Sequence, residues 1–394
     1  MFARSRAPLT RMLDCLTLAV GLFVAGCGTL PTSGPTARQV ISQQTDDKQS
    51  RFMVIDINNR VVDNLLAAPR ASLRARFPHR NAPPDPRIGI GDSVVVTIWE
   101  AAGGGLFAST ASDQIVPGSR SVILPEQVVG RDGAISVPFG GRIPVAGRVP
   151  VEVQHAIEQR LAGKAIDPQV IVTVSKSVTN TVTVTGEAIG GARLPLSLKG
   201  DRLLDLIAAA GGSHAPVYET VVRLSRGGVT VSIPMETLVA DPRENIYAEP
   251  GDVLTVVRAP RSFSVFGATG QNSQIDFPSA KLTLAEALAK AGGLQDARSD
   301  PAGVFLFRYE PTQILGALDQ KPANVTPDGR APIVYRLNLR DAKAYFDAKR
   351  FPVEDKDVLY VANADLDELQ KFFSLIGTLT APAITGVVVK NATQ

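Results

Sequence analysis

Cysteine is almost absent from this chain of 394 residues. Its two cysteines, Cys15 and Cys27, both lie within the first 27 residues, so the rest of the chain has neither disulfide bonds nor a cysteine-ligated metal. The three histidines are far apart in the sequence, and their spacing does not indicate a metal site. We therefore expect no bound metal and no cofactor.

An excess of charge of one sign is also lacking. The formal net charge is +3, and no basic block makes nucleic acid the expected partner. Hydrophobic residues make up 44% and charged residues 20%, which is typical of a folded protein and not of a disordered one. The length suggests about two to four domains.

Common catalytic motifs are missing as well. The sequence contains no G-x-S-x-G, H-E-x-x-H or Walker A pattern, and the glycines at Gly103–Gly105 lack the lysine of a phosphate-binding loop. Four aspartates, Asp92, Asp132, Asp252 and Asp357, are expected at turns beside strands, where turn chemistry accounts for them. We predict that the protein is not an enzyme, although a carboxylate pair for glycoside hydrolysis stays an open alternative.

The first 26 residues are typical of a bacterial export signal. A basic start is followed by an apolar run from Leu16 to Ala25, which at about ten residues is too short to span a bilayer. The sequence Val24–Cys27 is similar to a lipoprotein processing site, so Cys27 is the predicted lipidation site. The alternative is an ordinary signal with an incidental cysteine. Residues 27–85 are expected to form a lipidated tether and N-terminal segment, with a polar, turn-rich tether at 28–50.

The body divides into one strand-and-helix domain and two repeats. The domain, 86–176, combines a strand entry at 88–99, a predicted hairpin at 131–138 with Asp-Gly as its turn, and an apolar helical face at 150–162. The first repeat is 177–260 and the second repeat is 261–362. Matching landmarks lie 81 residues apart at Gly186 and Gly267, and again at Gly211 and Gly292.

The second repeat is longer than the first by about 24 residues, which we expect to form a surface loop in the stretch 311–332. Each repeat opens with a strand, has a short helix that ends at a Gly-Gly pair, and closes with another strand. The predicted fold class is therefore α+β, with small mixed sheets and short helices, followed by an amphipathic C-terminal helix at 363–394.

These landmarks together resemble the outer-membrane polysaccharide export family. The domain at 86–176 is similar to its polysaccharide export domain through Ile88–Asp92, Arg131–Gly133, Gly140–Ile143, Ala156–Leu161 and Asp167–Val170, in that order. The repeats are similar to its soluble-ligand-binding (SLBB) β-grasp domains, through Val184–Gly186, Ala209–Gly212, Ala291–Gly293 and Gly251–Leu254.

The resemblance implies a lipid-anchored protein of the outer membrane with its body in the periplasm. It implies a homo-oligomeric ring through which capsular polysaccharide or exopolysaccharide passes, with one C-terminal helix per subunit crossing the outer membrane. The implied inner-membrane partner is a polysaccharide co-polymerase with an ABC exporter, which is slightly favoured over a flippase–polymerase system. The alternative is a periplasmic polysaccharide-binding lipoprotein or adaptor without its own pore.

The C-terminal segment has a local pattern that suits membrane insertion. Eighteen residues, 372–389, carry no charge and as a helix would span about 27 Å, close to the hydrocarbon thickness. Pro382 should kink this helix. A final helix packed on the body is the alternative that we disfavour. The predicted lipid face is Phe373, Ile376, Leu379, Ile384 and Val387, and the predicted pore or helix-contact face is Ser374, Gly377, Thr378, Ala381 and Thr385.

Overall fold

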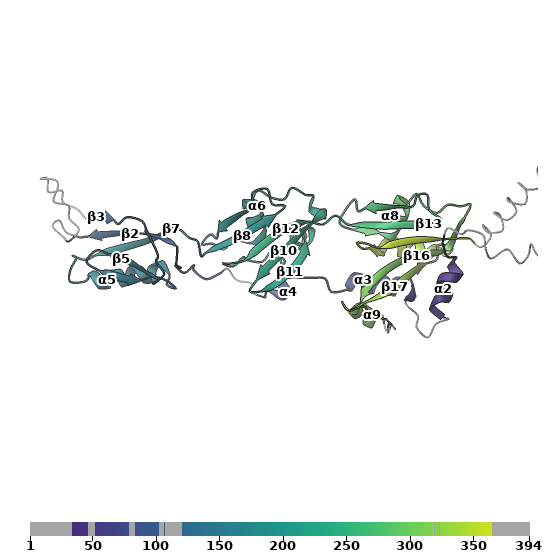
Figure 1. The fold of residues 1–394 in the computed structure, drawn as a ribbon, viewed down its shortest axis with the longest axis horizontal. Helices are drawn as coiled ribbons and strands as arrows, with labels where there is room; N and C mark the ends of the chain where they lie inside the picture. The colour runs from purple at the N-terminus through teal and green to yellow at the C-terminus, as the bar shows by residue number, and fades with distance from the viewer. Residues whose placement is uncertain are drawn as a thin grey trace, which may run out of the picture. The chain divides into compact units, whose positions relative to one another are not determined.

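The computed structural model describes residues 34–45, 52–78, 83–101, 106, 120–318, 320, 322 and 324–364. The chain divides into two folded units, which we call the central unit (Arg70–Pro260) and the terminal unit (Met1–Pro69 with Arg261–Gln394). Both units mix small sheets with short helices, as the sequence predicts (Figure 1). The predicted C-terminal helix lies outside the described residues. None of the helices that are described is long and apolar enough to cross a membrane.

The first domain of the central unit is a four-stranded sheet with one helix and one hairpin packed against it. The sheet is formed by β2 (Ser93–Glu100), β3 (Arg120–Ile123), β4 (Gln127–Val128) and β7 (Gln169–Lys176). The helix α5 (Pro150–Leu161) buries Val153, Ile157 and Leu161, the apolar face that the sequence predicts. These side chains share one core with Val96 and Ile98 of β2.

The hairpin of this domain is displaced from its predicted position. It consists of β5 (Ala134–Val137) and β6 (Gly141–Pro144), which pair in antiparallel fashion from Ala134 with Pro144 to Val137 with Gly141. Asp132 and Gly133 precede β5 instead of joining two paired strands. The prediction was wrong because an Asp-Gly pair indicates a turn without indicating which strands flank it.

The first repeat forms a five-stranded sheet in the order β11-β10-β12-β8-β9. Its strands are β8 (Thr181–Gly186), β9 (Ala192–Pro195), β10 (Thr220–Arg226), β11 (Val229–Pro234) and β12 (Val253–Arg258). The helices α6 (Leu203–Ala209) and α7 (Met235–Ala240) and the 3-10 turn η1 (Val217–Glu219) accompany the sheet. The predicted helix stop is confirmed, since α6 ends just before Gly211 and Gly212, both with positive φ.

The second repeat has the same strand order with one strand added. The order β1-β17-β16-β19-β13-β14 uses β13 (Ser262–Gly267), β14 (Ser273–Asp276), β16 (Ser299–Pro311), β17 (Arg330–Leu337) and β19 (Val358–Asn363). A small pair, β15 (Leu282–Thr283) and β18 (Pro352–Val353), and three helices, α8 (Leu284–Lys290), α9 (Thr312–Ala317) and α10 (Ala342–Arg350), complete it. The repetition inferred from the sequence is therefore visible in the topology.

Two glycines at equivalent positions explain the landmark that opens each repeat. Gly186 ends β8 at φ +92° and Gly267 ends β13 at φ +96°. A Cβ atom at Gly186 would lie 2.1 Å from the carbonyl oxygen of Val256, and one at Gly267 would lie 2.0 Å from that of Val361. Only glycine fits both the backbone conformation and the close approach of the neighbouring strand.

The extra residues of the second repeat lie in the expected stretch 311–332, but the prediction of a surface loop was wrong for the part that forms the helix α9. In the first repeat Leu224 of β10 pairs with Val231 of β11, seven positions later. In the second, Leu306 of β16 pairs with Tyr335 of β17, twenty-nine positions later. The insertion thus joins these two strands, and it includes α9, which buries Leu315, as well as a loop.

The N-terminal segment is more folded than the predicted tether. Within the expected tether at 28–50, residues Ala37–Thr45 form the helix α2, which packs Ala37 and Val40 against Phe305 and Val334. Further along, β1 (Met53–Asp56) pairs in parallel with β17, and α3 (Asn59–Ala67) packs into a second core, which contains Ile333 and Tyr335 of β17. The expectation of a polar tether was wrong for α2, because its polarity suits a helix with only one buried side.

The N-terminal segment also contributes to the central unit. The short helix α4 (Leu73–Arg76) buries Leu73 in the core of the first repeat. The carboxylate of Glu244 accepts hydrogen bonds from the hydroxyl of Ser72 (2.6 Å) and from the backbone N–H of Leu73 (2.7 Å). One N-terminal segment therefore supplies structure to both repeats.

Candidate functional site

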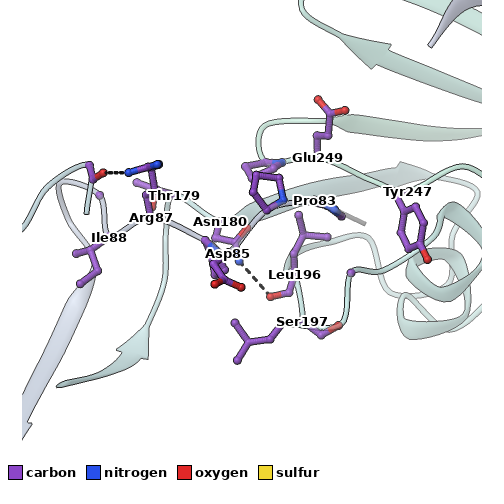
Figure 2. Close-up of a pocket in the computed structure, with 17 residues that line it drawn as sticks. Pro83, Asp85, Arg87, Ile88, Thr179, Asn180, Leu196, Ser197, Tyr247 and Glu249 are labelled. Atoms are coloured by element: carbon purple, nitrogen blue, oxygen red, sulfur yellow. Dashed lines mark hydrogen bonds between the residues drawn. The ribbon is translucent and has the colours of Figure 1, made fainter. Parts of the chain in front are cut away.

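A pocket of about 860 Å³ lies in the central unit, at the junction of the first domain and the first repeat (Figure 2). Two chain segments connect these parts, and both line the pocket: the proline-rich stretch 83–89 and the stretch that contains Thr179 and Asn180. The first repeat contributes Tyr247 and Glu249. The other lining residues are Gly147, Leu196, Ser197, Leu198, Gly200 and Pro250.

Two polar side chains of this pocket are held by backbone carbonyl groups. Arg87 donates a hydrogen bond from Nη1 to the carbonyl oxygen of Gly147 (2.6 Å), and Asn180 donates from Nδ2 to that of Leu196 (3.2 Å) (Figure 2). Arg202 stacks on the ring of Tyr247 at 4.4 Å from its centroid. Two hydroxyl groups of the lining donate to carboxylates, that of Ser197 to Asp201 and that of Thr179 to Asp92, both at 2.8 Å.

Asp92, which the sequence analysis places at a turn, ties the two connecting segments together. Its Oδ2 accepts hydrogen bonds from the backbone N–H of Gly89 (2.8 Å) and the hydroxyl of Thr179 (2.8 Å). Its Oδ1 accepts from the N–H groups of Val178 (2.7 Å) and Thr179 (3.1 Å) and from the hydroxyl of Ser177 (3.2 Å). Asp92 is 1% exposed, so it acts as a buried clamp on the junction.

The protonation of Asp92 reflects these contacts. Burial alone would raise the pKa of its carboxyl group, but the N–H groups of Gly89 and Val178 and both donors of Thr179 hold the pKa below its ordinary value. The clamp is therefore charged over the physiological range.

The same aspartate turn occurs in both repeats, where the carboxylate binds an arginine. Asp252 accepts from the N–H of Glu249 (2.9 Å) and pairs with Arg226 through two hydrogen bonds of 2.8 and 2.6 Å. Asp357 accepts from the N–H of Glu354 (2.7 Å) and pairs with Arg308 at the same two distances. These turns, together with that of Asp92, confirm that turn chemistry accounts for three of the four aspartates.

Asp132, the fourth of these aspartates, has a different and more exposed environment. Its carboxylate forms an ion pair with Arg142 of β6, and its side chain is 48% exposed. It also accepts a long hydrogen bond from the N–H of Ala134 (3.4 Å) at the start of β5.

Around Arg308 the second repeat buries an unusual density of charge. Burial alone would lower the pKa of its guanidinium, but the carboxylates of Asp357, Glu354 and Glu310 raise it. Glu310 is completely buried and accepts hydrogen bonds on Oε1 from Arg308 (3.1 Å) and from the hydroxyl of Tyr335 (2.9 Å). Its other oxygen, Oε2, has no hydrogen-bond partner among the described residues. This cluster was not predicted from the sequence, because Arg308 and Asp357 are 49 residues apart along the chain.

We expect Glu310 to make the stability of the second repeat sensitive to pH. Burial, the largest cause, raises its pKa, so the folded state binds the proton more tightly than the unfolded state. The resulting stabilisation is fully present below the unfolded pKa, about 4.3, and is lost as the pH rises through the folded pKa. Hydrogen exchange of β16 amides across this range should show that loss in the native protein and a flatter dependence in Glu310→Gln. Equal slopes would contradict the shift.

Other predicted site residues lie outside the described part of the chain. These are the lipidation residue Cys27 and both predicted faces of the C-terminal helix, which begin at Phe373 and Ser374. Among the described residues, no group of three or more His, Cys, Asp and Glu side chains is arranged to hold a metal ion.

Two family models match the chain. The one described as "Polysaccharide biosynthesis/export protein" matches residues 80–175, and the one described as "SLBB domain" matches residues 261–361. The first therefore covers the domain that contains Asp92, and the second covers the repeat that contains Arg308 and Asp357.

Several curated proteins are similar over most of the chain. "Capsule polysaccharide export outer membrane protein CtrA" of Neisseria meningitidis serogroup A is 39% identical over 373 residues, which cover 93% of this chain and 96% of that protein. "Capsule polysaccharide export protein BexD" of Haemophilus influenzae is 38% identical over 377 residues, 93% of this chain and 95% of that protein. "EPS I polysaccharide export outer membrane protein EpsA" of Ralstonia solanacearum is 27% identical over 314 residues, covering 77% and 78%.

Proposed function

Because this chain belongs to the outer-membrane polysaccharide export family, we propose that it exports capsular polysaccharide or exopolysaccharide across the outer membrane. The observation that carries the proposal is the similarity to CtrA and BexD along almost the whole length of each protein. Such coverage includes the domain and both repeats, so it is not limited to one shared module.

The structure of the terminal unit supports a place for the second repeat near the membrane. The hydroxyl of Tyr360 donates a hydrogen bond to the carbonyl oxygen of Pro35 (2.7 Å), and α2 follows at once. Cys27, the proposed lipidation site, precedes Pro35 by eight residues, which span at most about 28 Å. At the other end, β19 of the same sheet ends at Asn363, where the proposed membrane-spanning segment 363–394 starts. Both proposed attachments thus begin at one sheet.

The proposed mechanism is passive. The chain supplies a lipid-anchored, homo-oligomeric conduit, whose C-terminal helices line the pore with their weakly polar faces and present their apolar faces to lipid. Such two-faced helices need neighbours, because a single one would expose polar groups to the bilayer. The inner-membrane co-polymerase and exporter supply the energy.

Removing the two attachments tests this function in the strain that encodes the protein. Deleting 364–394 is expected to abolish surface polysaccharide while polymer accumulates inside the cell, because the conduit is lost. Cys27→Ser should reduce surface polysaccharide by releasing the protein from the membrane, and Cys15→Ser, inside the leader, is the matched control without effect. Immunolabelling of intact and permeabilised cells measures both pools.

Electron microscopy of the detergent-extracted protein distinguishes the pore from its alternative. Closed rings with a detergent-bound end that disappears on deletion of 364–394 are expected. The alternative, a polysaccharide-binding lipoprotein without a pore, predicts two other results. The extracted protein would be monomeric, and deletion of 364–394 would leave surface polysaccharide unchanged.

A further inference from the structure

A second pocket, of about 760 Å³, lies within the terminal unit, where α3 and α10 begin beside the ends of β1 and β17. We call it the α3–α10 pocket. Its volume is in the range of small-molecule sites in proteins. Its lining combines carboxylate, amide and cationic side chains with the aromatic ring of Phe346.

Asp347 is the feature that points to a ligand. It is only 8% exposed and lies on the buried side of α10 with Ala344 and Ala348. Within the described part of the chain, its carboxylate makes no hydrogen bond and no ion pair, although it lines the pocket. Because this carboxylate has no protein donor and lines the pocket, a molecule that supplies hydrogen-bond donors there would be bound favourably.

Most other polar groups of the pocket already have protein partners. Asp56 pairs with Arg336 through hydrogen bonds of 2.5 and 2.8 Å. Asn58 caps α3 by accepting from the N–H of Val61 (3.0 Å), and Asp341 caps α10 by accepting from the N–H of Lys343 (3.0 Å). These side chains are therefore engaged in contacts within the protein.

A smaller set of groups remains for a ligand, together with Asp347. The amide oxygen of Asn59 accepts from Arg350 (3.2 Å), and that of Asn338 accepts from the N–H of Arg340 (3.1 Å), which leaves both amide NH₂ groups as donors. The ammonium group of Lys343 is a further donor. Phe346, 74% exposed, offers an apolar surface at the rim.

The charges of the lining select the class of ligand. Three cationic side chains, Arg60, Arg336 and Lys343, are balanced by the carboxylates of Asp56, Asp341 and Asp347. A neutral lining with one strong acceptor, several donors and an apolar edge matches a pyranose ring. Such a ring carries adjacent hydroxyl groups, which both donate and accept hydrogen bonds, and it has an apolar C–H face.

We propose that the α3–α10 pocket binds a neutral pyranose unit of the exported polysaccharide, with the Asp347 carboxylate accepting from two adjacent hydroxyl groups. The choice of this ligand rests on the proposed function, whereas the site itself rests on the pocket and its unpaired carboxylate. The junction pocket is a weaker candidate, because Arg87 and Asn180 are already bound to carbonyl groups.

The test uses full-length protein in detergent and oligosaccharides released by mild acid from the capsule of the same strain. Saturation-transfer NMR and calorimetry are expected to detect binding that weakens at least tenfold in Asp347→Asn, since the charged acceptor is lost. The variant should fold as the native protein does, because no protein contact of the carboxylate is removed. The matched control is Asp328→Asn, an aspartate whose side chain is 67% exposed, which should bind as the native protein does.

Equal affinity of Asp347→Asn and the native protein would overturn the proposal, and so would the absence of binding to the native protein. Neither result would affect the export function, because surface polysaccharide is measured separately in cells. The opposite combination is also distinguishable. If the purified protein binds the oligosaccharide through Asp347, but cells that lack the protein still carry surface polysaccharide, the site is supported and the export function is contradicted.

Discussion

Replacing Arg308 with methionine is expected to destabilise the second repeat by about 3–5 kcal/mol, the usual cost of removing one partner of a buried ion pair. The side chain of Arg308 is 4% exposed, and its loss would leave Asp357 and Glu310 buried without their counter-ion. The carbonyl oxygen of Pro352 would also lose its donor (2.8 Å). Hydrogen exchange measured by mass spectrometry should show opening of β16 and β19 that is about two to four orders of magnitude more frequent.

Two other arginines provide controls for Arg308→Met. Arg226→Met removes the equivalent pair of the first repeat, where the partner Glu249 is 38% exposed, so the effect should be smaller and confined to β10 and β12. Arg243 pairs with Asp241 at the surface and is 70% exposed, so Arg243→Met should change exchange little. A similar change in exchange for Arg308→Met and Arg243→Met would contradict the role assigned to the buried cluster.

Replacing Asp92 with asparagine should destabilise the first domain by about 3 kcal/mol or more, because hydrogen bonds to a buried charged group each contribute about 1.5–3 kcal/mol. An amide has one acceptor oxygen, so its NH₂ group would face the donors of Gly89 or Val178. Trp99, the single tryptophan of the chain, lies on β2 seven residues after Asp92. Its fluorescence therefore reports urea unfolding of this domain.

The sign of the pH dependence provides a second readout. Because the folded state lowers the pKa of Asp92, its stabilisation is present above the unfolded pKa of about 3.9 and is lost as the pH falls through the folded pKa. The difference between the native protein and Asp92→Asn should therefore shrink below about pH 4. Asp132→Asn, at the half-exposed turn of the same domain, is the control with a small effect. A difference that is constant down to strongly acidic pH would count against the clamp.

Local patterns predicted local structure well. The period of Val153, Ile157 and Leu161 predicted α5, and the Gly-Gly pairs predicted the ends of α6 and α8. These features depend on residues within one or two turns of chain, so a single sequence contains the information. The equal spacing of landmarks likewise predicted two copies of one fold, which the matching strand orders confirm.

Strand pairing between distant segments was not predicted from the sequence. Met53–Asp56 is only four residues long, and it becomes a strand because β17 offers an edge about 280 residues later. Nothing in four residues specifies a parallel partner at that distance. The hairpin of the first domain shows the same limit on a smaller scale, since Asp132–Gly133 gave the turn without the pairing.

In the candidate sites, too, the local contacts were predicted from the sequence and the contacts between distant residues were not. The aspartate turns at Asp92, Asp252 and Asp357 were evident from sequence, because a carboxylate that accepts from an N–H three residues earlier is a local interaction. What each carboxylate binds beyond its turn depends on its neighbours in space. Arg226 and Arg308 come from adjacent strands, whereas Asp92 has the connecting segment 177–179 beside it.

The sequence by itself determined the repeats, the helix ends, the aspartate turns and the resemblance to a family, since each depends on residue types at short or regular spacings. The tertiary structure alone decided that α2 and β1 join the second repeat, that Arg308 is buried among carboxylates, and that Asp347 lines a pocket without a partner. The reason is physical: burial and pairing depend on which distant segments exclude water from one another, and spacing along the chain does not encode this directly.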